Sequence, residues 1–219
     1  MRRGRALAVA ILLVGCAAVQ PPRDPLTAEQ RNDLGVTYFQ RGDGRRALAE
    51  FEHVVALRPG WARALANLGD ARLALGDVPG AIEAYQRAVA AAPDDPGAAN
   101  NLAWALLQDP ARWREAEPII DGALAKQPEP RGYYLDTLGA LRLRQGDNQA
   151  ALAAFRAALA DAAFRDRRSR AIVLDHAAEA LQRLGDPTAA AHCRALAETE
   201  RAGAGSGDVS AVGQAGSVC

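Results

Sequence analysis

A pattern of small, apolar and aromatic residues recurs along this chain with a spacing of about 34 residues. Each recurrence begins with a leucine and a small residue, and continues with an alanine and a bulky residue four positions after it. The first pairs are Leu34-Gly35, Leu68-Gly69, Leu102-Ala103 and Leu138-Gly139, and the later pairs are Ala47 and Phe51, Ala81 and Tyr85, Ala116 and Ile120, and Ala151 and Phe155. A fixed period of this length is typical of proteins built from stacked structural repeats.

These residues resemble the tetratricopeptide repeat, a helix-turn-helix unit, over about residues 28–200. The resemblance implies an all-α fold, a right-handed α-solenoid of about five such units. The expected units are 28–61, 62–95, 96–130 and 132–165, followed by a degenerate unit at 171–201 that caps the stack. Beyond the last unit, residues 202–219 are expected to form a disordered tail, because they have too little apolar content to pack.

Physical reasons support these residue types in a helical hairpin. The small residues are expected where the two helices cross, since larger side chains would force the backbones apart, and the aromatic residues are expected to fill the space toward the next unit. Four Gly-Asp pairs are expected at the turns, with the glycine in a left-handed cap and the aspartate capping the second helix. Their glycines are Gly42, Gly76, Gly146 and Gly185. The third unit differs, with Ala103 in place of glycine and a longer turn at 108–113.

Composition strengthens the helical expectation and argues against one class of partner. The chain is rich in alanine, the best helix former. Basic and acidic residues number 26 each, and without a cationic excess no binding to nucleic acid is expected. Its three histidines and four serines fall in no hydrolase motif and no paired ligand spacing. We therefore expect no catalytic residue, no metal and no cofactor.

The N-terminus has the pattern of a secretory signal, with three arginines before the apolar residues 6–14, a segment too short to span a bilayer. It ends in Leu13, Val14, Gly15 and Cys16, which resembles the lipobox of bacterial lipoproteins. The resemblance implies a signal peptide at 1–15, acylation of Cys16 with palmitate-type chains, and a tether at 16–27. The expected location is the bacterial cell envelope, anchored by lipid and facing the periplasm at the outer membrane. An ordinary signal with a chance cysteine, or a short uncleaved anchor, is the alternative.

The resemblance also implies that the first helix of each unit lines a concave groove where protein segments bind. Candidate groove residues are Asn32, Phe39, Arg63, Asn67, Asp70, Asn100, Asn101, Trp104, Tyr133, Asp136 and Arg144. Asn67 and Asn101 stand one repeat apart and could hold the backbone of an extended peptide, because an amide both donates and accepts. Local hydrogen bonding is the alternative. Trp104 is either a contact anchor or packed against the neighbouring helix.

The expected function is that of a non-enzymatic, membrane-anchored adaptor that binds an unidentified protein or peptide. A pilotin-like assembly factor for a pilus or secretin is a specific alternative. The substrate-binding subunit of an envelope enzyme is disfavoured, because a basic linker, 165–170, separates Asp136 from Asp175 and His176. Cys193 and Cys219 could pair in an oxidising compartment or remain free thiols, and the sequence leaves both possibilities open.

Overall fold

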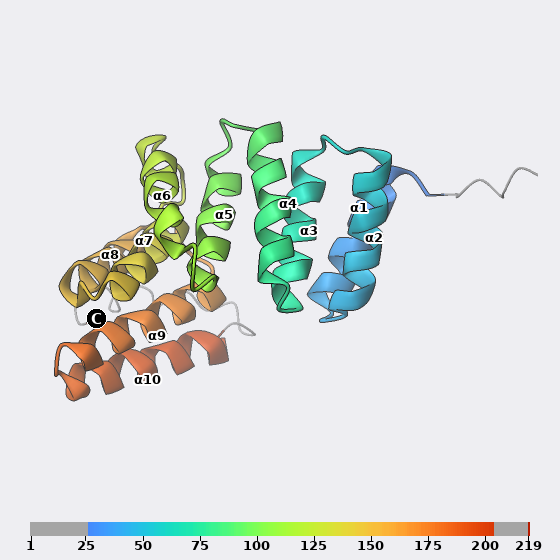
Figure 1. Ribbon diagram of the computed structural model, residues 1–219. Coiled ribbons are helices and arrows are strands. Elements are labelled where there is room, and N and C mark those ends of the chain that lie inside the picture. The colour runs from blue at the N-terminus through green and yellow to red at the C-terminus, as the bar shows by residue number, and fades with distance from the viewer. Residues whose placement is uncertain (1–25, 204–218) are drawn as a thin grey trace, which may run out of the picture.

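The computed structural model describes residues 26–203 and residue 219, so the expected signal peptide, Cys16, most of the tether and residues 204–218 lie outside the described residues. The described part is all-α and forms a helical solenoid of five hairpins (Figure 1). Their helices are α1 (Ala28–Gln40) with α2 (Gly44–Leu57), α3 (Ala62–Ala74) with α4 (Val78–Ala91), α5 (Pro96–Gln108) with α6 (Ala116–Ala125), α7 (Gly132–Gln145) with α8 (Asn148–Ala160), and α9 (Arg167–Arg183) with α10 (Pro187–Gly203).

The hairpins stack in chain order, and the helix axes turn along the stack, so that α9 and α10 lie across the direction of α3 and α4 (Figure 1). Each first helix contacts the first helix of the next hairpin, and each second helix packs between its own first helix and the following one. The first helices α1, α3, α5, α7 and α9 therefore form one continuous wall. No helix in the described residues is long and apolar enough to cross a membrane.

The turns within the hairpins confirm the expected cap chemistry. Their four glycines have φ values of 80°, 82°, 85° and 84°, a region that favours glycine over residues with a Cβ atom. The aspartate after each glycine accepts a hydrogen bond from a backbone N–H in the first turn of the second helix, at 2.9–3.3 Å. In the third hairpin the glycine is absent, and a short 3₁₀ helix, η1 (Trp113–Glu115), precedes α6.

The small residues of the first helices lie where an aromatic ring of the second helix presses against the backbone. A Cβ atom added at Gly139 would lie 2.3 Å from the ring of Phe155, and the corresponding distances are 2.6 Å from Gly35 to Phe51 and 2.5 Å from Gly69 to Tyr85. The rings thus cover the glycines of their own hairpins. In the third hairpin Ala103 takes the place of the glycine and Ile120 that of the ring, and both are fully buried in one core cluster.

The last hairpin begins earlier than the sequence indicated, because α9 starts at Arg167 and includes most of the supposed basic linker. Arg170 is only 1% exposed, and its Nε atom lies 3.1 Å from Glu200 Oε1 on α10. Its Nη1 atom also donates to the carbonyl oxygens of Leu159 and Phe164. Arg167 approaches the second oxygen of Glu200 at 3.0 Å. Arg167 and Arg170 of the basic segment therefore form a buried ionic contact with Glu200, which joins α9 to α10.

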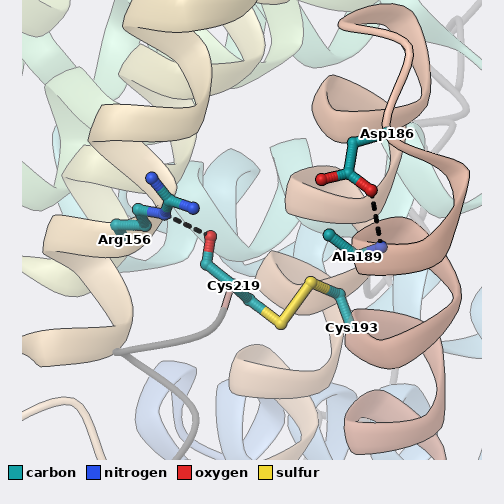
Figure 2. The surroundings of a disulfide bond; sticks show 5 residues. All are labelled: Arg156, Asp186, Ala189, Cys193 and Cys219. Atoms are coloured by element: carbon teal, nitrogen blue, oxygen red, sulfur yellow. Dashed lines mark hydrogen bonds between the residues drawn. A yellow bond between two sulfur atoms is a disulfide. The ribbon is translucent and has the colours of Figure 1, made fainter.

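Cys193 and Cys219 form a disulfide, which resolves the question that the sequence left open. Cys219 is fully buried in the core cluster of the last two hairpins. Figure 2 shows that its carbonyl oxygen accepts a hydrogen bond from Arg156 Nε on α8, at 2.5 Å. The C-terminal residue is thus fastened to α10 by a covalent bond and to α8 by a hydrogen bond.

Candidate binding groove

Two adjoining cavities open on the wall formed by α5, α7 and α9, and Trp104 lines both of them. The larger cavity, of about 550 Å³, is lined by Trp104, Leu107, Gln108, Ala140, Leu143, Arg144, His176, Glu179 and Arg183. The smaller cavity, of about 260 Å³, is lined by Asn100, Asn101, Trp104, Tyr133, Asp136, Thr137, Phe164, Ser169 and Ile172. We call the two cavities together the groove. It combines an aromatic centre with polar ends, which suits a polypeptide segment.

A histidine–aspartate pair stands between the two cavities. His176 Nδ1 on α9 lies 2.7 Å from Asp136 Oδ1 on α7, and the imidazole ring is flanked by Trp104 and Phe155, with ring centroids 6.0 and 5.6 Å away. Burial lowers the pKa of His176, but the hydrogen bond and charge of Asp136, with the charges of Glu179 and Asp175, outweigh it and raise the pKa above its ordinary 6.5. The pair therefore links α7 to α9 and supports the indole of Trp104.

Two arginines of the larger cavity donate hydrogen bonds to carbonyls at the C-terminal ends of α5 and α7. Arg144 donates to the carbonyl oxygen of Leu107, and Arg183 donates to that of Leu143 at 3.0 Å. Both carbonyls lie in the last turn of their helices, where the regular helical hydrogen bonds end. The cavity thus has a rigid, basic rim, in which Arg183 also pairs with Glu179 at 2.5 Å.

The structure brings together six of the eleven expected groove residues. Asn100, Asn101, Trp104, Tyr133 and Asp136 line the smaller cavity, and Arg144 joins Trp104 in the larger one. The other five, which line neither cavity, are Asn32, Phe39, Arg63, Asn67 and Asp70.

Three of these N-terminal polar residues, Asn32, Asn67 and Asp70, make hydrogen bonds within the stack. Asn67 Nδ2 on α3 donates to the buried Asn32 Oδ1 on α1 at 2.8 Å, a hydrogen bond between neighbouring first helices. Asp70 accepts from the Tyr85 hydroxyl at 2.5 Å. Burial raises the pKa of Asp70 more than this hydrogen bond lowers it, and burial together with Asp70 raises the pKa of Tyr85.

Sequence reasoning left the contribution of α9 and the preceding loop out of the groove. His176, Ile172, Phe164 and Ser169 line it, although they were absent from the expected binding residues. A signal was present for His176, which precedes Gly185 by nine residues, as Asn67 precedes Gly76. This correspondence was missed because the first helix of the last hairpin was expected to begin at 171, after a linker, whereas α9 begins at Arg167.

The polar groups of the groove include a serine hydroxyl and several carboxylates and imidazole or guanidinium groups. Ser169 donates its hydroxyl hydrogen to Asp166, the residue that caps α9, at 2.5 Å. The hydroxyl hydrogen therefore does not point to His176. No group of three His, Cys, Asp or Glu side chains in residues 26–203 and 219 is arranged to hold a metal ion. The groove instead offers aromatic surface, amides and charges of both signs.

Two family models of the tetratricopeptide repeat match residues 32–96 and 72–138. Similar solved structures include PilF of Pseudomonas aeruginosa (22% identity, 79% of this chain and 76% of that chain, TM-score 0.64) and MamA of Desulfovibrio magneticus RS-1 (18%, 80% and 96%, 0.59). The Cut9–Hcn1 hetero-tetramer of APC/C is also similar (19%, 81% and 35%, 0.72). At these identities the likeness concerns the fold alone. No curated protein sequence matches the chain.

Proposed function

Because the chain is a tetratricopeptide-repeat protein, we propose that it is a non-enzymatic adaptor that holds an extended segment of another protein in the groove. The observation that carries the proposal is the pair of cavities that meet at Trp104 on the wall of first helices. An indole between two openings can contact a segment that occupies both, and aromatic residues in such positions contribute strongly to binding.

The second part of the proposal is a lipid anchor at Cys16, which would keep the adaptor at a membrane of the cell envelope, facing the periplasm at the outer membrane. It is supported by the Leu13-Val14-Gly15-Cys16 motif after a basic and apolar leader. A disulfide between Cys193 and Cys219 agrees with an oxidising compartment. A pilotin-like factor, which would assist a pilus or secretin, is the specific form of this adaptor that combines the anchor with a membrane assembly as partner.

Binding in the groove is tested by the double variant Asn101→Ala with Trp104→Ala. The variant removes the shared aromatic contact and one amide of the smaller cavity, so we expect partner capture from solubilised envelope to fall at least tenfold, the size of one anchor contact of about 2 kcal/mol. Quantitative mass spectrometry of the captured proteins provides the measurement. Gln86→Ala, on the exposed face of α4, is the matched control and should capture as the parent does.

Helicity by circular dichroism must remain unchanged for the comparison to hold. If partners were captured equally by the double variant and the parent, another surface would be the binding site. A milder variant, Asn101→Ala alone, keeps the indole and checks the result without a change in aromatic packing or in charge.

The lipid anchor predicts a change in mass and in partition. Intact-mass spectrometry of the protein from its native host should give a mature chain that begins at Cys16 and carries acyl groups, and Cys16→Ser should lose both the acyl mass and membrane association. One acyl chain binds a membrane marginally and two or more bind it firmly, so the loss should be nearly complete. If the parent and Cys16→Ser differed in mass only by the substitution itself and were equally abundant in the membrane fraction, the lipid anchor would be refuted.

A further inference from the structure

Within the adaptor proposed above, on which this inference rests, we propose that the smaller cavity receives a lysine or arginine side chain of the bound segment. The cavity lies between α5, α7 and the start of α9, and its lining combines hydrogen-bond acceptors with aromatic and aliphatic side chains. The nine side chains that line it include one acid, Asp136, and no lysine or arginine. Its charge is therefore complementary to a cation.

The acceptor atoms in the lining favour a ligand that carries hydrogen-bond donors. Asn100 Oδ1 is buried and accepts no hydrogen bond, a state that costs free energy until a donor arrives. His176 engages Oδ1 of Asp136, so Oδ2 is available to a second donor. Thr137 and Ser169 donate their hydroxyl hydrogens to Tyr133 O and Asp166, and so can only accept from a ligand. An ammonium or guanidinium group supplies donors and no acceptor, which is what these atoms require.

The walls fit the apolar stem that precedes such a charge. Tyr133 is 40% exposed and Ile172 48% exposed, and they are among the few large hydrophobic residues that remain open to solvent. Phe164 meets the Tyr133 ring edge-on at a centroid distance of 4.7 Å and holds it in place. Methylene groups can pack against these surfaces, and a cation beside the rings of Trp104 and Tyr133 gains a cation–π attraction.

The larger cavity sets the opposite preference. Arg144 and Arg183 line it. The acceptors of Arg144 are backbone carbonyls, which carry no negative charge, so Arg144 keeps its positive charge at this cavity. A basic side chain is repelled there and attracted on the other side of Trp104. The groove therefore places the basic residue of the segment in one cavity only and fixes the direction in which the segment lies.

The proposal is tested with fluorescent dodecapeptides that have random flanking residues and lysine, arginine, norleucine or glutamate at one central position. The full-length protein, purified in detergent, should bind the lysine and arginine pools about tenfold more tightly than the norleucine pool, the size of one hydrogen bond to a charged group. Asp136→Asn should remove that preference, so that the lysine, arginine and norleucine pools bind with similar affinity. His176→Gln should keep or increase it, because glutamine places no positive charge beside Asp136 at any pH.

The opposite effects of the two variants separate recognition from a structural role. If the pair only stabilised the groove, Asp136→Asn and His176→Gln would weaken all four pools alike, and this result would overturn the inference. A preference for norleucine or glutamate would overturn it too, while the adaptor function would stand. If no pool bound in a manner that depended on Trp104, the proposed function would itself fail, and the inference with it.

Discussion

Replacing Glu200 with glutamine should lower the free energy of unfolding by about 3 kcal/mol, because the change leaves two arginines without their carboxylate. Arg170 is almost fully buried and lies 3.1 Å from Glu200, and Arg167 approaches the same carboxylate at 3.0 Å. An unpaired charge in the interior costs far more than a lost pair at the surface. Equilibrium denaturation in urea, followed by circular dichroism, measures the difference.

The matched control is Asp175→Asn, which breaks the ion pair of Asp175 with Arg201 on the same two helices. Both side chains are more than a third exposed, so solvent screens the pair and the change should cost at most about 0.5 kcal/mol. Equal effects of the two substitutions would contradict a buried ionic contact between α9 and α10. Adding Arg170→Met to Glu200→Gln should recover part of the loss, because it removes the buried cation that Glu200 faces.

Alanine at Gly139 should destabilise the protein by about 2 kcal/mol through overpacking. Its Cβ atom would come within 2.3 Å of the Phe155 ring, and a ring enclosed in the core cannot shift without displacing its neighbours. Thermal and urea unfolding measure the effect. The control is Gly122→Ala in α6, where an added Cβ meets nothing within 4 Å and alanine should stabilise the helix by up to about 1 kcal/mol.

The third hairpin suggests how to relieve the clash. It pairs Ala103 with Ile120, both fully buried, in the places that Gly139 and Phe155 occupy in the fourth. Gly139→Ala combined with Phe155→Ile should therefore be more stable than Gly139→Ala alone. A double variant that unfolds more readily than the single one would show that the glycine and the aromatic residue do not form the packing unit that we infer.

The hairpins could be predicted because their determinants are local and repeated. In every hairpin but the third, a glycine with positive φ fixes the turn and the next aspartate caps the second helix. In three of the hairpins a glycine of the first helix lies against an aromatic ring of the second. Each of these constraints acts within one unit of about 34 residues. Their recurrence therefore specified the elements and the stacking before any coordinate was known.

The groove was harder to predict from the sequence because its contacts join residues of different units. Arg170 belongs to a run of arginines that resembles an exposed linker, but in the fold it is buried against Glu200, thirty residues away, and the carbonyl oxygens of Leu159 and Phe164. Once that run is helical, His176 approaches Asp136 across forty residues. Asn67 looked like a ligand for peptide backbone, but Asn32 of the preceding repeat occupies its amide. Repeat spacing alone gives no information about such pairings.

The most direct test of the account is to identify what contacts the groove in the envelope. The photo-crosslinking amino acid p-benzoylphenylalanine, in place of Ile172 at the edge of the smaller cavity, should form a covalent adduct with one segment of another protein. The same amino acid in place of Gln86 on α4 should give none, and mass spectrometry identifies the linked peptides. Adducts from position 86 with none from position 172 would contradict the central claim that the α5, α7 and α9 wall holds the partner.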